Sequence, residues 1–444
     1  MLEKAGKNSG DNRRDNRGLV LRMVATGACR TRRDLVVRTG LSKMTISNIV
    51  GEMIDGDVLR ESEVVCSEEP GRNPVRLRLS PEAPKAAGVA FLPGRCESVL
   101  CGLDLRVFRR AGTDLPKDAP EAVRRETALR LLDKMLSGTA GVRAIGLAAD
   151  LPWRPGGEQM CPSESVRPAV RERYGLPVFL EDTCQSALLV ESLFGRARNC
   201  RDVLFVSLGD RVGSAVLSGG QLCRGRGGRP LGLGHVTICA GGRPCRCGGR
   251  GCLELYVRSP EVLKKLYHRT GLEASYADFC RITGSGEVDR VFRETVDFLA
   301  AGIASALNLL NSELVLLGGD GLCWTDRHVA DLESAIARLR PADGGGRVLV
   351  RKPRFLGEGR FWGRPAAGSP GSSRGSYLFK TGDFPGRLAA ISEIPQKVHF
   401  SPIKTSAKRL TLNAGNGLII DANDCKTTSD KEDHWWTFTA LARC

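Results

Sequence analysis

Hydrophobic residues recur at helical spacing three times within the first 55 positions of the chain. The first set lies within residues 17–26, and Gly27 ends it. A second, shorter helix is predicted from Thr31, a suitable N-cap, and a third over residues 42–54. Gly40 supplies the turn between these two helices. The three apolar faces therefore predict a small helical unit with its own core.

The third predicted helix turns polar side chains outward near its start, while its apolar residues face the core. A short helix, a glycine turn and a helix with a polar start are typical of a helix-turn-helix, whose second helix enters the major groove of DNA. Hydroxyl and amide side chains there reach phosphates and base edges without blocking close approach. A small helical bundle unrelated to DNA is the alternative. The candidate DNA contacts are Arg32, Ser42, Lys43, Met44, Thr45, Ser47 and Asn48.

Apolar and charged residues alternate over 58–61 and again over 75–79, which predicts a two-stranded wing after the third helix. Arg72, in the loop between these strands, is a further candidate DNA contact, in the minor groove. We therefore predict a winged helix-turn-helix DNA-binding domain over residues 17–80. A flexible basic arm is expected over residues 1–16.

Hairpins, buried strands and helices then follow in an order that appears twice. This alternation predicts a two-lobed α/β body with a cleft, its first lobe over residues 85–195 and its second over 196–358. The expected strands are 87–92, 98–104, 142–148, 178–182, 203–208, 213–217 and 314–319. The expected helices are 120–136, 183–194 and 288–310.

A glycine-rich stretch over residues 234–254 holds one histidine and closely spaced cysteines. Thiolates and imidazole are ligands that zinc prefers, and three Cys with one His complete a tetrahedral structural site. Cys239 lies in the same stretch at a less suitable spacing. Reduced, half-buried thiols on a loop are the alternative. The predicted zinc ligands are His235, Cys245, Cys247 and Cys252.

The 444 residues carry a formal net charge of +16, and the first 50 contain eleven lysines and arginines against four acidic residues. This excess favours an anionic partner such as DNA. No apolar run of about 18 residues and no apolar segment of a signal peptide is visible. We therefore expect a cytoplasmic protein without membrane contact, whose 16 cysteines are reduced or bound to metal.

The helix-turn-helix around Gly40, the turn at Asp182, the hairpin after Val203 and the 234–254 stretch together resemble the ROK family of repressors and sugar kinases. The likeness extends from about residue 13 to about residue 322. It is greatest to the winged-helix repressor branch, which includes the xylose and N-acetylglucosamine regulators. The resemblance implies an actin-like, sugar-kinase-type body that carries a structural zinc loop.

The resemblance also implies roles for acidic residues. Asp182 matches the catalytic base of the family's kinases, and Glu181, His235 and Glu254 fall at positions for sugar binding. A carboxylate can accept charge-assisted hydrogen bonds from sugar hydroxyls. The alternative is an acidic cluster bonded to backbone amides.

Departures from the kinase pattern indicate that ATP binding is lost. The family's Asp and Gly-Gly-Thr turn are missing from residues 90–95, and the second phosphate loop contains Asp210 and Arg211. A bulky side chain and a carboxylate there oppose phosphate binding. Gly232 replaces a sugar-binding Glu. We therefore expect no enzyme activity and regard Asp182 as the relic of a kinase base.

We predict a DNA-binding transcriptional regulator, a repressor of carbohydrate-uptake or metabolism genes. Its expected partners are a double-stranded operator, a sugar or sugar-phosphate effector, and further copies of itself in a homodimer or higher homo-oligomer. The alternatives are a sugar kinase with an added DNA-binding domain and a decayed, inactive family member.

The likeness fades from about residue 359, and lysine replaces arginine as the favoured cation beyond Tyr377. Two interpretations of residues 359–444 stay open. One is a shifted reading frame or replaced C-terminus that is poorly ordered, and the other is a lineage-specific extension.

Overall fold

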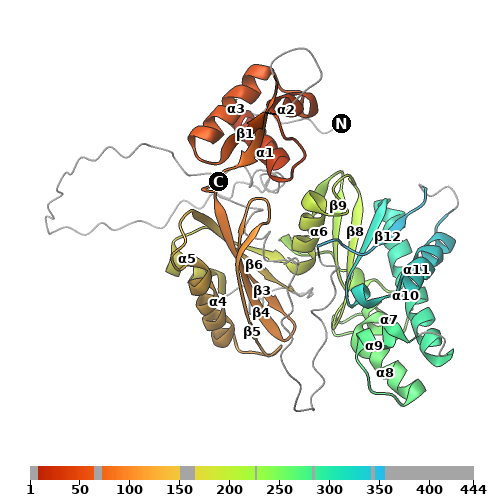
Figure 1. The fold of residues 1–444 in the computed structure, drawn as a ribbon. Coiled ribbons are helices and arrows are strands. Elements are labelled where there is room, and N and C mark those ends of the chain that lie inside the picture. The colour runs from red at the N-terminus through yellow and green to blue at the C-terminus, as the bar shows by residue number, and fades with distance from the viewer. Residues whose placement is uncertain are drawn as a thin grey trace, which may run out of the picture.

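The computed structural model describes residues 9–64, 73–150, 166–225, 228–282, 286–341 and 346–355. Figure 1 shows an N-terminal unit above a first lobe, with a second lobe beside them. The predictions for Arg72 and for the tail over 359–444 lie outside the described residues. None of the helices in these ranges combines the length and apolar character that crossing a membrane requires.

The N-terminal unit consists of three helices and a hairpin, as the sequence predicts: α1 (Ser9–Ala25), α2 (Arg32–Thr39), α3 (Lys43–Asp55), β1 (Leu59–Val64) and β2 (Val75–Leu79). β1 and β2 pair antiparallel with Leu59 opposite Leu79. The chain before α2 adds a bridge to this hairpin between Thr31 and Arg76. The wing is therefore attached to the start of α2 as well as to the end of α3.

The predicted flexible arm is wrong for residues 9–16, which form the first turns of α1. The guanidinium groups of Arg13 and Arg17 bond the carboxylate of Glu52 on α3. Because this part of the helix is polar, the spacing of apolar residues does not reveal it. The ion pairs to a residue far along the chain favour the helical arrangement instead.

The first lobe contains a five-stranded sheet of order β5-β4-β3-β6-β7. Its elements are β3 (Lys85–Leu92), β4 (Arg95–Gly102), β5 (Val107–Asp114), α4 (Glu121–Leu136), β6 (Val142–Ala149), α5 (Val166–Tyr174) and β7 (Val178–Asp182). The predicted strand over 98–104 starts earlier, at Arg95, because a tight turn pairs Arg95 with Leu92. The helix α6 (Thr183–Phe194) then leads toward the second lobe.

The second lobe repeats the same strand order as β10-β9-β8-β11-β12. Its strands are β8 (Val203–Leu208), β9 (Gly213–Ser218), β10 (Gln221–Cys223), β11 (Leu314–Gly319) and β12 (Leu349–Arg351). In both sheets the first two pairings are antiparallel and the other two parallel. Its helices are α7 (Glu254–Val257), α8 (Ser259–Thr270), α9 (Tyr276–Arg281), α10 (Gly286–Leu310) and α11 (Asp326–Leu339). The predicted two-lobed α/β body is confirmed.

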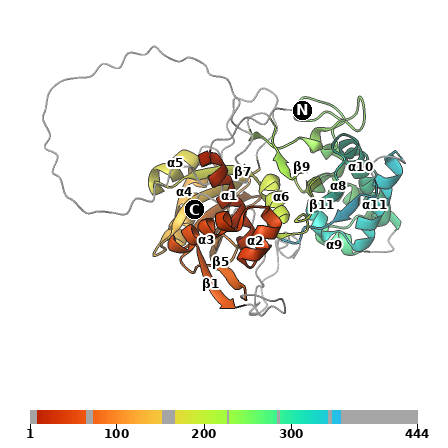
Figure 2. The same ribbon diagram turned by 90° about the horizontal axis from the view of Figure 1, so that it is seen from above.

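α6 lies between the two lobes in both views (Figures 1 and 2). One cluster of buried apolar residues runs from the N-terminal unit, through the first lobe and α6, to the second sheet. Leu35, Leu103, Leu188 and Phe205 are among its members, each at most 1% exposed. The burial of this apolar surface connects the three parts of the molecule.

A buried carboxylate joins the end of α6 to the segment that follows β12. Glu191, on α6, accepts hydrogen bonds from the backbone N–H groups of Arg196, at 2.8 Å, and Phe355, at 2.6 Å. A Cβ at Gly195 would lie 2.1 Å from the Glu191 carboxylate, so only glycine leaves room for it. We call Glu191 with these two amides the interlobe clamp. It fixes the chain after β12 against the end of α6.

Candidate functional site

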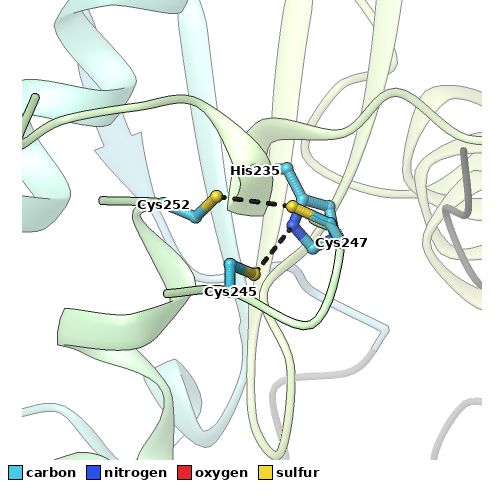
Figure 3. Close-up of side chains that lie close together, drawn as sticks. All are labelled: His235, Cys245, Cys247 and Cys252. Carbon is cyan, nitrogen blue, oxygen red and sulfur yellow. Dashed lines mark hydrogen bonds between the residues drawn. The ribbon is translucent and has the colours of Figure 1, made fainter. Parts of the chain in front are cut away.

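The four predicted zinc ligands meet in one cluster on the second lobe (Figure 3). Their ligand atoms all lie within 4.8 Å of one another. The Cys247 and Cys252 sulfurs are 3.6 Å apart, and the Cys245 sulfur is 3.6 Å from His235 Nδ1. Tetrahedral zinc with Zn–S bonds of about 2.3 Å places sulfurs about 3.8 Å apart. The donor set and its spacing therefore fit such an ion.

The metal loop, residues 234–254, is folded by its glycines and by short backbone contacts. Gly251 has φ +68°, and a Cβ there would lie 1.7 Å from the carbonyl oxygen of Cys239. The Cys245 N–H donates to the Gly249 carbonyl, and the Gly249 N–H lies 3.4 Å from the Cys247 sulfur. An N–H directed at a sulfur favours the thiolate, the form that binds metal.

The protonation of the cluster is consistent with binding a cation. Burial lowers the pKa of His235, which keeps its imidazole neutral and able to bind metal. Burial and the neighbouring thiols raise the pKa of Cys252 to about 12. Without a cation this thiol stays protonated at neutral pH, so metal binding there must release a proton.

Glu254 lies directly beside the cluster and is only 1% exposed. Its Oε1 is 3.5 Å from the Cys245 sulfur, 3.8 Å from His235 Nδ1 and 3.5 Å from Arg246 Nε. The predicted sugar-site residues His235 and Glu254 are therefore neighbours. Their position ties this part of the predicted sugar site to the metal loop.

The metal loop is also attached to the helices that follow it. The Arg243 guanidinium donates to the carbonyl of Leu255 at 2.8 Å and to the Glu261 carboxylate at 2.7 Å. Arg258 donates to the same carboxylate. Burial opposes ionisation of Glu261, yet the hydrogen bonds from Arg243 and Arg258 lower the pKa of its carboxyl to about 2.

The other two predicted sugar-site residues, Glu181 and Asp182, end β7 in the first lobe and are 5% and 4% exposed. Asp182 caps α6, because its Oδ1 accepts hydrogen bonds from the N–H groups of Cys184, at 2.8 Å, and Gln185, at 3.3 Å. The Oδ1 atom of Asp182 is therefore bonded to backbone amides, which is the alternative to sugar binding that the sequence left open. The four sugar-site residues form two pairs, one on each lobe.

Charged side chains cross between the lobes near these residues. Arg224, directly after β10 of the second lobe, bonds Glu181 of the first. Lys117, after β5, bonds Asp210 in the turn between β8 and β9. At the same boundary, a Cβ at Gly213 would lie 2.5 Å from the Cys184 sulfur, so the two lobes touch closely.

Sequence reasoning did not identify Arg224 or Lys117. The strand that positions Arg224 has three residues, which is too short to leave a recognisable alternation. Lys117 lies in an irregular segment after a strand that was not predicted. The second phosphate loop departs from the kinase pattern at Asp210. In the structure this carboxylate pairs with Lys117, so an ion pair occupies the turn.

The helix α3 presents the predicted polar face to solvent. Lys43, Ser47 and Asn48 are exposed, and Met44 is 76% exposed. Ser42 caps the helix, because its hydroxyl accepts a hydrogen bond from the Thr45 N–H at 3.1 Å. The hydroxyl oxygens of Ser42 and Thr45 are 2.9 Å apart.

Among the other candidate contacts, Arg32 bonds Glu61 on the wing strand β1. The buried residues Ile46, Ile49, Val50 and Met53 form the opposite face of α3, as predicted. The polar face of the helix is therefore available to a partner.

Part of the chain matches a known protein family. A model of the ROK family matches residues 159–342. The chain is 25% identical over 315 residues to a xylose repressor of Bacillus subtilis (strain 168), covering 68% of this chain and 81% of the relative. It is 31% identical over 166 residues to a glucokinase of Thermotoga maritima, covering 33% of this chain and 52% of that enzyme.

A crystal structure of a ROK family transcriptional regulator, a homologue of the E. coli MLC protein, has the same fold with a TM-score of 0.66. It is 22% identical, and the match covers 78% of this chain and 93% of that one. Residues 159–342 therefore match the ROK family model, and the described chain shares the fold of this regulator.

Proposed function

We propose that this chain is a sugar-responsive transcriptional repressor. The observation that carries the proposal is the combination, in one chain, of an exposed polar helix face on a winged unit with a ROK family body. Similarity to a xylose repressor over 81% of that relative supports the same function. The target is proposed to be a set of genes for carbohydrate uptake or metabolism.

DNA is proposed to bind the N-terminal unit, with the start of α3 in the major groove. Lys43, Met44, Ser47 and Asn48 would contact bases and phosphates, while Ser42 and Thr45 hold the helix end. A homodimer would place two such helices on half-sites about one helical turn, roughly 34 Å, apart. The surplus of basic residues near the N-terminus supports binding to phosphates.

The effector is proposed to be a sugar or sugar phosphate bound between the lobes, with contacts from Glu181, Asp182, His235 and Glu254. The two buried carboxylates of the first lobe and the buried Glu254 carboxylate of the second would accept hydroxyl hydrogen bonds. A ligand that favours one interlobe arrangement biases the protein toward it, and so changes the spacing of the DNA-binding units.

A structural zinc ion is proposed at His235, Cys245, Cys247 and Cys252. When bound, zinc would replace the thiol protons and hold the metal loop closed. The chain's own contribution is to hold Glu254 beside the cluster and Arg243 on Glu261. The zinc site would thereby keep one side of the sugar site in place.

A sugar kinase with an added DNA-binding unit is the second candidate, because the chain also matches a glucokinase over part of its length. Two observations weigh against catalysis. The Lys117–Asp210 pair occupies the turn where a phosphate loop is expected, and one Asp182 oxygen caps α6. We therefore propose that the protein has no kinase activity.

The test uses the purified full chain and DNA selected from a random duplex library. We expect one enriched sequence with two related half-sites, bound less tightly as salt rises. D-xylose, D-glucose and glucose 6-phosphate are then added, and at least one should weaken binding. The Asn48→Ala variant should lose about tenfold in affinity through the missing base contact. The exposed Lys134, on α4 of the first lobe, supplies the matched control, and Lys134→Ala should bind like the unaltered chain.

Two results would overturn parts of this proposal. Absence of any enriched sequence at low salt would remove DNA recognition. Transfer of phosphate from ATP to any of the sugars would reinstate the kinase.

A further inference from the structure

The contact between Glu181 and Arg224 joins the two lobes at the proposed sugar site. Glu181 precedes the last residue of β7, where it pairs with Ala148 of β6 in the first sheet. Arg224 follows β10, the edge strand of the second sheet. Their side chains are 7% and 23% exposed, and the Oε2 to Nη2 distance of 2.5 Å marks a direct charged hydrogen bond. The pair is therefore a largely dehydrated link between the lobes.

Partial burial makes this link stronger than an exposed one. Charged hydrogen bonds gain strength where water is excluded, and loss of either partner leaves the other charge buried without its neutralising group. The second crossing pair, Lys117 with Asp210, has side chains that are 58% and 43% exposed. Exposed pairs of this kind contribute little. Among the described residues, these two pairs therefore provide a natural comparison.

The Glu181 carboxylate and the Arg224 guanidinium can together bind two neighbouring hydroxyl groups. A carboxylate accepts hydrogen bonds from hydroxyl groups, whereas a guanidinium donates to hydroxyl oxygens. A sugar with neighbouring hydroxyls therefore satisfies both at once, one hydroxyl donating to Glu181 and the other accepting from Arg224. Inserting the sugar requires their direct contact to open, because the two groups touch in this structure.

We propose that Glu181 and Arg224 form an interlobe latch, which a polyhydroxylated ligand opens by taking the hydrogen bonds of both side chains. Arg224 is thereby a ligand-binding and specificity-determining residue contributed by the second lobe. This inference rests on the proposed function, since it assigns how the proposed effector couples to the arrangement of the lobes.

Cys184 reports directly on the latch. It lies in the first turn of α6, is 7% exposed and has its sulfur against Gly213 of the second lobe. Separation of the lobes at this boundary exposes the thiol to a labelling reagent. Cys280, fully buried in the core of the second lobe, should stay protected and serves as an internal control.

The experiment measures the N-ethylmaleimide labelling rate of Cys184 in the full chain by peptide mass spectrometry. Arg224→Gln and Glu181→Gln should each raise the rate by about tenfold, as expected for loss of one charged hydrogen bond. The double variant should be no faster than either single variant. Lys117→Gln, which removes the exposed pair, should change the rate by less than about threefold.

The charge-swapped variant, Glu181→Arg with Arg224→Glu, restores the pair and should label nearly as slowly as the unaltered chain. Labelling of Cys280 detects misfolding, because a misfolded single variant would label this buried cysteine as well. An unchanged rate in Arg224→Gln, or additive effects in the double variant, would overturn the latch.

D-xylose and D-glucose then test the ligand step. The sugar that binds should raise Cys184 labelling in the unaltered chain and have little further effect in Arg224→Gln. A sugar that binds without changing the labelling rate would refute ligand opening. If neither sugar binds, the proposed effector fails, while the comparison of variants without sugar still decides whether the latch exists.

Discussion

Cys247 and Cys239 lie in the same loop, yet only Cys247 belongs to the four-residue cluster. Cys239 is exposed, and its carbonyl rather than its sulfur has a defined role, because it packs against Gly251. The difference arises from the backbone. The tight turns of the loop direct three sulfurs and one imidazole at the same point and leave the fourth sulfur outside.

The pair of cysteines gives a matched test of the metal site. Cys247→Ser should lose zinc, because the hydroxyl is a poor replacement for a thiolate ligand. Cys239→Ser should keep about one zinc per chain. Elemental analysis of the purified proteins measures both. Full metal retention in Cys247→Ser would count against the site, and loss in Cys239→Ser would indicate a different ligand set.

Single residues also show which parts of the site are readable from sequence. The four metal ligands were predictable because their spacing and their glycines are local features of one stretch. Arg224 was not, because its importance depends on Glu181, which lies 43 positions earlier in the chain. No local pattern reveals such a contact, which forms only when the two sheets come together.

At the scale of elements, the caps of the N-terminal helices define their boundaries. Thr31 and Asp34 form a reciprocal capping box at the start of α2, and Ser42 caps α3. The cap at Thr31 was predicted from the residue type alone. These helix starts are therefore encoded locally, and α3 begins at a defined residue.

Ser42, the N-cap of α3, and Ser47, within α3, give a matched test of the helix cap. Ser42→Ala should destabilise the N-terminal unit by about 1 kcal/mol, because the Thr45 N–H loses its acceptor. Ser47→Ala, an exposed change on the same helix, should leave stability within about 0.5 kcal/mol. Denaturant unfolding of the N-terminal unit within the full chain measures both. Equal destabilisation by the two changes would contradict the role of Ser42 as a cap.

Elements that depend on distant partners were predicted less well. The ends of α6, β8 and β11 were predicted at the residues where the structure has them. In contrast, the start of α1, the strands β5, β10 and β12, and the helices α5, α7, α8, α9 and α11 were not predicted. Ion pairs to Glu52 stabilise the polar turns of α1, and β10 and β12 are three residues long and pair along sheet edges. The start of α1 and these two short strands depend on tertiary contacts rather than on local periodicity.

At the scale of the whole molecule, the interlobe clamp sets how the two lobes are held. Glu191 is fully buried and bonds one amide just after α6 and one after β12. The rings of Phe194 and Phe355 pack edge-to-face beside it, with centroids 6.4 Å apart. The clamp lies near the end of α6, and the proposed latch lies just before its start. Both therefore restrain the position of α6.

Glu191→Gln should destabilise the protein by about 1.5–3 kcal/mol, because one charged acceptor is replaced by an NH₂ group that cannot accept the amide hydrogen bond. The half-buried Ser192 on the same helix bonds the Leu189 carbonyl within its own helix, so Ser192→Ala serves as the control and should change stability little. Thermal unfolding and hydrogen exchange at the Phe355 amide measure the effect. A Phe355 amide that stays equally protected in Glu191→Gln would argue against the clamp.

The identical strand order of the two sheets has a consequence for how recognition is distributed. By topology the lobes are two copies of one pattern, in which Asp150 follows β6 as Asp320 follows β11. The copies differ most in one connection, over residues 115–141 in the first and 224–313 in the second. Arg224, the metal loop and Glu254 all lie in the longer connection. The first lobe thus supplies its residues of the proposed effector site from the end of a strand, while the second supplies them from an enlarged connection between strands.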